Sequence, residues 1–343
     1  MSGRVRLARL TDLAALGELS RLSQQEHVDA RSLGLPLSGP RIGVFSLFRL
    51  PLGAFRPNDL LFVYEDERRL SGLLRVERDA SRDEMTIVEL DAIGSGDSGD
   101  TRYRLVQHLL RDGTKRGAFR FHVACADVQG NVELFMQAGF ARYGQELLLF
   151  RGAGMKLPQA WPDEKARSAG IRPCQSLDAL PLARLYASVT PQPVVRLEAY
   201  RLHDWERQGS STRVPRSSLA PILRFADVEA YVQEARDDGP GALAALLQVG
   251  VAREEQPHDL RIMARPGADV DSLVDFGLGL VRTRIEKGGN CPDNGVLAPV
   301  RTYESPVDRR LEEAGFSNLA TVTLLMKEAV VRVAEPALVP AVR

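Results

Sequence analysis

The pattern of apolar and polar positions occurs twice along the chain. One segment begins at Val5 and reads VRLARLTDLAALGELSRL, and it matches a second that begins at Ile171 and reads IRPCQSLDALPLARLYAS. Each predicts a short strand, a polar break and then a helix, because its later apolar residues recur at helical spacing. Asp12 and Asp178 fall at the same position of the two segments. The same local structure is therefore expected at two places 166 residues apart.

Two further pairs of segments match downstream. Residues 60–79 and 229–250 both alternate apolar and polar side chains around a charged or glycine-rich turn, which is typical of hairpins. Near the end of each repeat, FMQAGFARYGQELLLFR pairs with LEEAGFSNLATVTLLMK, and the shared AGF triplets place Gly139 and Gly315 in register 176 residues apart. Differences in loop length explain the growing offset. The sequence therefore predicts two diverged copies of one fold.

A boundary between the copies is expected at residues 152–170, which are rich in glycine, proline and charge, as linkers are. We call residues 1–151 the first copy and residues 171–343 the second copy, and we expect each to form a module of its own. Each predicts a strand, a helical segment, antiparallel strands, a long helix, a strand, a short helix and a final strand. The long helices are expected at 101–116, between strands 85–93 and 118–124, and at 271–287, between strands 259–265 and 295–301.

These elements predict the fold class. Antiparallel strands followed by one strand, helix, strand crossover indicate an α+β protein of the α/β sandwich type. Each copy would then be a mixed, mostly antiparallel sheet with flanking helices. Each also carries a poorly patterned insert, His27–Asp59 in the first and Thr190–Ala226, with Trp205, in the second. Such inserts are either binding loops or ordered surface excursions, and the sequence leaves both interpretations open.

Composition excludes several classes of protein. Forty-five Lys and Arg balance forty-five Asp and Glu, so the basic excess expected of a nucleic-acid or anionic-membrane partner is absent. Because the chain has no long apolar run and no signal-peptide pattern at its start, a cytoplasmic protein without a membrane partner is expected. Its cysteines and histidines lack the spacing of a metal site, so we expect no metal. They are Cys125, Cys174, Cys291, His27, His108, His122, His203 and His258.

A glycine-rich stretch offers a rival interpretation. Gly94, Gly96 and Gly99 have the GxGxxG spacing of a dinucleotide-binding turn, directly after a predicted strand and before a helix. The run LDAIGSGDSGD is equally similar to the first motif of methyltransferases. Antiparallel hairpins precede this stretch and only one crossover follows it, whereas a dinucleotide-binding fold begins with that unit. Neither run recurs in the second copy, so neither explains the duplication.

The crossovers and the AGF triplets resemble the GNAT acetyltransferase superfamily, arranged as a tandem of two modules. In that family a bulged strand is followed by a loop, Arg or Gln, two residues, Gly, one residue, then Gly or Ala. This loop opens the long helix and holds the pyrophosphate of acetyl-CoA, as helix N-termini can. A tyrosine on the short helix protonates the leaving thiolate, ahead of a glycine and an aromatic residue. The closing pairs in this chain are Gly139 with Phe140 and Gly315 with Phe316.

The chain departs from the family pattern at the loop and at the tyrosine. The three loop positions fall on Asp97, Asp100 and Arg102 in the first copy and on Asp269, Ser272 and Val274 in the second, and none keeps the family residue. The tyrosine position holds Phe135 in the first copy and Leu311 in the second, and we expect both to be buried apolar side chains of a short helix. The start of the second long helix, PGADVDSLVD, has three acidic residues and no basic one. Binding of acetyl-CoA is therefore expected in the first copy alone.

The resemblance implies an acetyl-CoA-dependent N-acetyltransferase acting on a small-molecule or peptide amine. The alternative is a non-catalytic protein that binds a small molecule or another protein. Glu89 or Asp91, on the strand before the loop, would take the amine proton, or these carboxylates are only exposed strand residues or crossover neighbours. The residues expected to hold acetyl-CoA are Ala92, Ile93, Gly99, Asp100, Thr101, Arg102, Arg104 and Asn131.

Overall fold

The computed structural model describes most of the chain. The described residues are 3–26, 33–34, 58–67, 69–93, 98–128, 130–208, 211–212, 214–219, 223, 225, 227–235, 241–252, 256–287, 291–304 and 306–329. Most of the first insert and the loop 94–97, which carries Gly94, Gly96 and Asp97, lie outside these residues.

The described elements of the first copy follow the expected order. They are β1 (Arg4–Leu7), a 3₁₀ turn (Leu10–Asp12), α1 (Leu13–Glu26), β2 (Asp59–Asp66), β3 (Arg69–Asp79), β4 (Glu84–Ala92), α3 (Ser98–Lys115), β5 (Arg120–Ala126), α4 (Asn131–Gln137) and β6 (Ala141–Arg151). The short helix α5 (Asp163–Ser168) follows within the expected linker.

The second copy repeats this order, with α7, a second 3₁₀ turn, β8 and β9 lying in its insert. Its elements are β7 (Ile171–Pro173), a 3₁₀ turn (Ser176–Asp178), α6 (Ala179–Val189), α7 (Gln192–Glu198), a 3₁₀ turn (Leu202–Trp205), β8 (Arg207–Gln208), β9 (Ser211–Thr212), β10 (Asp227–Glu234), β11 (Leu243–Val251), β12 (His258–Ala264), α8 (Val270–Glu286), β13 (Val296–Arg301), α9 (Val307–Glu313) and β14 (Ser317–Glu328).

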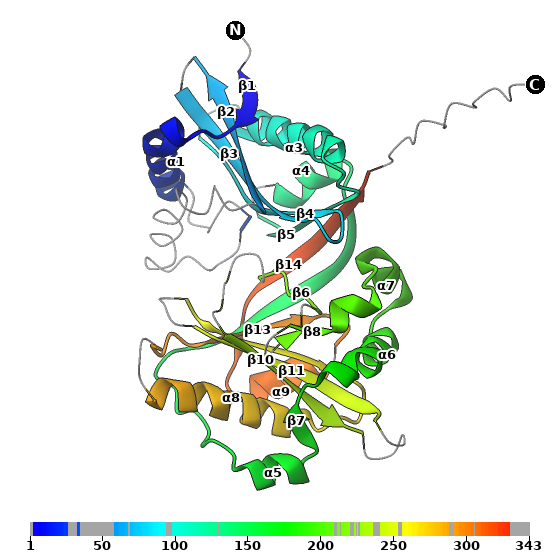
Figure 1. The fold of residues 1–343 in the computed structure, drawn as a ribbon. Helices are drawn as coiled ribbons and strands as arrows, with labels where there is room; N and C mark the ends of the chain where they lie inside the picture. Colours follow the sequence, from blue (N-terminus) through cyan, green and yellow to red (C-terminus); the bar gives the residue numbers. More distant parts are fainter. Residues whose placement is uncertain are drawn as a thin grey trace, which may run out of the picture.

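Twelve of the strands form one continuous sheet, in the order β1-β2-β3-β4-β5-β14-β6-β13-β12-β11-β10-β7. Only β4 with β5 and β12 with β13 are parallel neighbours, so the sheet is mixed and mostly antiparallel, as predicted. The final strands are exchanged: β14 pairs with β5 of the first copy, and β6 pairs with β13 of the second. Figure 1 shows the long strands β6 and β14 crossing between the two lobes of the molecule. Neither copy therefore completes its own sheet.

Helices pack on both faces of this sheet. In the first copy α1 contacts β3 and β4, while α3 contacts β2, β3 and β4. Gly113 of α3 lies so close to Met85 and Phe121 that an added Cβ would be within 3 Å of both side chains. Met85 and Phe121 therefore face α3. Because side chains alternate along a strand, Glu84, Thr86 and His122 face the opposite side of the sheet.

The expected linker packs on the second copy. Trp161 stacks edge-on against Phe276 of α8 with a ring separation of 6.1 Å, and the Leu157 carbonyl accepts a hydrogen bond of 3.1 Å from Arg282. The backbone of Gln159 lies within 3 Å of where a Cβ on Gly279 would be. These contacts fix residues 157–161 against α8. The division of the chain at residues 152–170 stays a prediction.

The repeated Asp12 and Asp178 have the same structural role. Each accepts two hydrogen bonds of 2.7–2.9 Å from one arginine, Arg6 or Arg172. Each also accepts a 2.7 Å bond from the backbone N–H three residues earlier, which closes the 3₁₀ turn. The shared sequence position therefore marks a duplicated turn and ion pair.

Phe135 and Leu311 are buried apolar side chains of short helices, as predicted. Phe135 lies on α4 and Leu311 on α9, and both side chains are buried in the apolar core.

Within the described part of the chain, no helix has the length and apolar character that crossing a bilayer requires.

Candidate functional site

Strand β4 carries a bulge that β12 lacks. Arg75 of β3 lies opposite Glu89 and the next residue, Val76, lies opposite Ile87, so Val88 is an extra residue in β4. The equivalent pairing of β11 with β12 runs from Ala245 to Gly250 without a shift. A bulge interrupts the hydrogen-bond ladder and bends its strand. The first copy alone therefore has a bend in the strand that precedes the long helix.

The parallel strands separate in both copies. Pairing of β4 with β5 ends at Ile87 and Val123, although both strands continue. Pairing of β12 with β13 ends at Asp259 and Leu297. Beyond these pairs the strands diverge and no longer share backbone hydrogen bonds. Side chains occupy the space between them. Glu89 and Arg261 each lie three residues before the end of their strand, opposite Arg75 of β3 and Gln248 of β11, so they occupy equivalent positions.

The two predicted catalytic carboxylates are buried. Glu89 is 2% exposed and Asp91 4% exposed, so the alternative that they are exposed strand residues is wrong. They lie opposite Arg75 and Leu73 of β3, and Leu73 belongs to the core beneath α1. Both carboxylates therefore lie on the face of the sheet opposite α3. Oε2 of Glu89 is buried without a hydrogen-bond partner in the described structure, which leaves one acceptor oxygen available.

The predicted cofactor residues at the start of α3 fall into an exposed group and a buried group. Gly99 and Asp100 are exposed, and Asp100 forms a 2.6 Å ion pair with Arg104. Thr101 is buried, and its methyl group packs where a Cβ on Gly72 would lie. Ala92 and Ile93, at the end of β4, are largely buried, and the Ile93 N–H donates to the Ser71 carbonyl. Arg104 is thus the basic side chain on the outer surface of this helix start.

Arg102 and Asn131 meet inside the protein. The Arg102 guanidinium donates a hydrogen bond to Oδ1 of Asn131, and neither side chain is appreciably exposed. Burial lowers the pKa of Arg102, while nearby Asp91 opposes this shift. Nδ2 of Asn131 is buried without a hydrogen-bond partner among the described residues. Arg102 therefore fixes the orientation of the Asn131 amide and leaves its N–H donors available.

Cys125 lies close to this pair, and its burial makes its thiol a poor nucleophile. Its side chain is fully buried on β5, and burial raises the pKa of the thiol to about 12. The thiol therefore stays protonated at neutral pH.

In the second copy the equivalent space is closed by a salt bridge. Arg261 donates to both carboxylate oxygens of Glu304, over 2.7 and 2.5 Å, and both side chains are almost completely buried. Glu304 also accepts a 2.8 Å bond from the Arg301 N–H at the end of β13. At the start of α8, the Asp269 side chain accepts from the Ser272 N–H. The chain's own carboxylate thus caps this helix.

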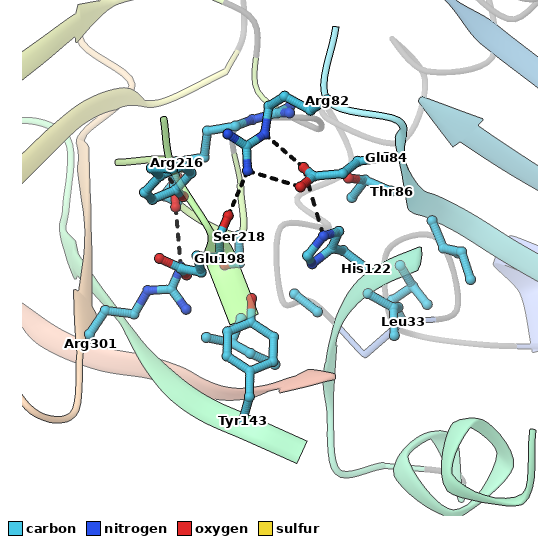
Figure 2. A pocket seen from close by; sticks show the side chains of 16 residues that line it. Leu33, Arg82, Glu84, Thr86, His122, Tyr143, Glu198, Arg216, Ser218 and Arg301 are labelled. Atoms are coloured by element: carbon cyan, nitrogen blue, oxygen red, sulfur yellow. Dashed lines mark hydrogen bonds and ion pairs between the residues drawn. The ribbon is translucent and has the colours of Figure 1, made fainter. Parts of the chain in front are cut away.

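A cavity of ≈ 80 Å³ lies between the two copies. Its lining residues come from β4, β5, β6, β13 and β14, from the turn between β3 and β4, from Leu33 of the first insert, and from the second insert, which includes α7 (Figure 2). They include Arg82, Glu84, Thr86, His122, Tyr143, Glu198, Tyr200, Arg216, Ser217, Ser218 and Arg301. Ile87 and Val123 also line it, so the cavity adjoins the point at which β4 and β5 separate.

Ion pairs that join the two copies hold the cavity walls. Arg82 donates two 2.9 Å bonds to Glu84 of its own copy, and it also donates to Asp204 and to the Glu198 carbonyl of the second. Glu198 accepts a 2.6 Å bond from the Tyr186 hydroxyl. Burial raises the pKa of Glu198, because a charged carboxylate is poorly solvated there, although Arg301 opposes the shift.

Sequence reasoning missed these cavity residues. They come from widely separated segments and share no motif, so only the fold brings them together. One signal was available: the second insert, with Trp205, supplies Glu198, Tyr200 and residues 216–218 of the wall. Described residues of this insert line a cavity, and its two interpretations, a binding loop or a surface excursion, stay open. Trp205 itself is buried against Tyr186 and Tyr200.

Comparisons with known proteins find similarity in structure only. No protein-family model matches the chain, and no curated protein matches it by sequence. A tandem GNAT protein from the clavulanic acid biosynthesis pathway superposes with a TM-score of 0.53 at 15% identity, over 96% of this chain and all of that one. A GCN5-related N-acetyltransferase from Sphaerobacter thermophilus superposes with a TM-score of 0.52 at 14% identity, over 95% of each chain.

Both neighbours are matched along nearly their whole length, so the similarity includes both copies and their arrangement. The duplicated element order, the separating parallel strands and these two superpositions agree. The chain has the tandem GNAT fold.

Proposed function

We propose that the protein is an acetyl-CoA-dependent N-acetyltransferase whose active site lies in the first copy. The observation that carries this proposal is the bulge at Val88, next to the point where β4 and β5 separate after Ile87 and Val123. In the family that the chain resembles, a bulged strand at this place receives the thioester of acetyl-CoA. The second copy has separating strands but no bulge.

The chain's own residues take separate roles in this proposal. The N-terminus of α3, with Gly99, Asp100 and Thr101, and the cation of Arg104 would hold the diphosphate. Nδ2 of Asn131, oriented by Arg102, would donate to a carbonyl of the pantetheine arm, because this donor is buried and has no other described partner. Ala92 and Ile93 would line the same channel.

Glu89 is the preferred base, because its Oε2 has no hydrogen-bond partner in the described structure, and Asp91 stands as the alternative. The amine nitrogen attacks the thioester carbonyl, a C–N bond forms and the C–S bond breaks, and the carboxylate takes the proton from nitrogen. Phe135 occupies the position at which the family has a tyrosine. The leaving thiolate would then take its proton from solvent.

Calorimetric titration of the full chain with acetyl-CoA tests where the cofactor binds. The full chain is needed because β6 and β14 each pair within the other copy. We expect one site per chain. Arg104→Ala should weaken binding about threefold, as expected for a partly exposed cation at a helix start, and the loss should shrink at high salt. Arg111→Ala, on the same helix but farther from its start, is the matched control and should bind normally.

Release of CoA thiol in the presence of a mixture of small amines and peptides tests catalysis. Glu89→Gln should bind acetyl-CoA normally and lose about 10²–10⁴-fold in turnover. A stoichiometry of two would disprove confinement to the first copy, and a folded chain without acetyl-CoA binding would disprove the proposed function.

The burial of Phe135 favours the second candidate function, a non-catalytic binding protein, because the position of the usual general acid holds an apolar side chain. Binding of acetyl-CoA without thiol release from any amine in the mixture would favour this candidate.

A further inference from the structure

In the cavity between the copies, a buried hydrogen-bond donor has no partner among the described residues, whereas each carboxylate oxygen of the lining glutamates already accepts a hydrogen bond. Both oxygens of Glu84 already accept from Arg82, and the two oxygens of Glu198 accept from Tyr186 and Arg301. Arg301, which is 5% exposed, uses Nε and Nη2 in contacts with Glu146, Glu198 and the Arg216 carbonyl. Its Nη1 is buried with no hydrogen-bond partner in the described structure.

Other polar groups surround the same space. Nε2 of His122, which donates or accepts according to the tautomer of the neutral ring, has no hydrogen-bond partner among the described residues. Figure 2 shows the Tyr143 ring pointing up into the space bordered by Ser218, His122 and Glu198. Three arginines and two glutamates line the cavity, and each of these side chains already forms an ion pair. Because an unpaired buried donor costs free energy, such a site favours a ligand that brings acceptor oxygens.

We propose that this cavity binds a small carboxylate, held by Nη1 of Arg301 with the Tyr143 hydroxyl. Guanidinium donors match a carboxylate in geometry and charge, and such bonds are stronger inside a protein than in water. A volume of ≈ 80 Å³ admits several water molecules or a short organic acid. The site requires both copies, because Tyr143 comes from the first and Arg301 from the second.

The position of the cavity suggests what the carboxylate belongs to. His122 and Thr86 lie on the face opposite α3, which is also the face of Glu89, and the cavity adjoins the separation of β4 and β5. If the proposed function holds, the ligand is the acyl acceptor, an amine with a carboxylate at its other end. This last step rests on the proposed function, whereas binding of a carboxylate does not.

Saturation-transfer NMR on the full chain without acetyl-CoA tests the site, with β-alanine and β-alaninamide as probes. They differ only at the end that Arg301 would hold. We expect millimolar binding of β-alanine and at least tenfold weaker binding of the amide, as for loss of one charge-assisted contact. Arg301→Lys keeps the charge but loses the planar guanidinium, so it should weaken β-alanine binding about tenfold.

Tyr143→Phe provides a second variant, should Arg301→Lys disturb the buried ion pairs. It should weaken β-alanine binding severalfold, while Tyr231→Phe, outside the cavity, should not. Equal binding of acid and amide, unchanged binding in Tyr143→Phe, or no β-alanine binding would overturn the proposal. Binding of β-alanine by a chain that does not bind acetyl-CoA would support the carboxylate site and remove the proposed function.

Discussion

The two copies share one backbone plan but differ at the place where their parallel strands separate. In the first copy this place holds Glu89, on a bulged strand, and its Oε2 has no hydrogen-bond partner in the part of the chain that the structure describes. In the second, the equivalent Arg261 is locked to Glu304 on a strand without a bulge. The first long helix starts with an exposed Arg104, while Asp269 caps the second. The two copies therefore keep the same strands and helices, but in the second copy a salt bridge occupies the space between the separating strands.

A fold and a site can therefore diverge independently. The apolar residues that form the sheet and helices are kept in pattern, since both cores need them. The polar residues at the separation are under no such constraint, because a salt bridge fills the space as well as a ligand does. The comparison can be tested at equivalent positions.

The largest expected effect is on the buried pair of the second copy. Arg261→Ala leaves the Glu304 carboxylate buried without its partner, so the free energy of unfolding should fall by about 3–5 kcal/mol. Glu89→Gln, at the equivalent position, removes a charge that has one unpaired oxygen and should change it by less than about 1 kcal/mol. Urea unfolding of both variants measures the difference. Equal losses would show that the two interiors do not differ as described.

The double variant Arg261→Met with Glu304→Leu is the control for the first prediction. It removes both charges and keeps an apolar filling, so it should cost much less than Arg261→Ala. A loss as large as that of the single variant would mean that packing, rather than the unpaired charge, dominates.

The second effect concerns His122, which pairs with Thr86, whereas Leu297 takes the equivalent place opposite Asp259 in the second copy. Burial lowers the pKa of His122 to about 4, because the surrounding protein solvates the imidazolium poorly; Glu84 opposes this shift and three arginines add to it. The unfolded chain, with a pKa near 6.5, binds the proton more readily. His122 should therefore cost no stability above pH 6.5 and about 3 kcal/mol near pH 4.

Unfolding of wild type and His122→Gln between pH 4 and 7 measures this effect. The difference between them isolates the histidine from carboxylates that titrate in the same range. This difference in the free energy of unfolding should be constant above pH 6.5. As the pH falls further, the wild type should lose stability relative to His122→Gln. A difference that stays constant down to pH 4 would contradict the lowered pKa.

The smallest effect should be the same in both copies. Asp12→Ala and Asp178→Ala each remove an arginine partner and the acceptor that closes a 3₁₀ turn, so each should cost about 1 kcal/mol. Hydrogen bonding from Arg6 lowers the pKa of Asp12. Burial raises the pKa of Asp178, but the hydrogen bonds from Arg172 and the Gln175 N–H, with the charge of Arg172, together outweigh it, so the pKa is lowered. Their stabilisation is present above pH 4 and is lost as the pH falls through the lowered values.

Thermal unfolding at pH 7 and pH 3 measures both variants. Losses that differ by more than about 1 kcal/mol between the copies would mean that the duplicated turn has diverged in energy, though its hydrogen bonds are the same.

Local patterns allowed much of the fold to be predicted. The long helices and their flanking strands lie within three residues of their expected bounds, because helical and alternating periodicity reflects which side of each element is buried. The same reasoning identified Phe135 and Leu311 as core residues. Glu89 could be named as a candidate, but its burial and its unpaired oxygen could not be, since these depend on α1 and β3 packing against it.

The duplication, the element order and the resemblance that implies acetyl-CoA could be predicted from the sequence, since each depends on residues close together in the chain. The three-dimensional fold decided that β6 and β14 exchange places, because strand pairing depends on which edges meet. It also decided that Arg261 closes the second copy with Glu304, and that Tyr143 and Arg301 border one cavity. These contacts join residues tens to more than a hundred positions apart, and their energy depends on a burial that no local pattern records.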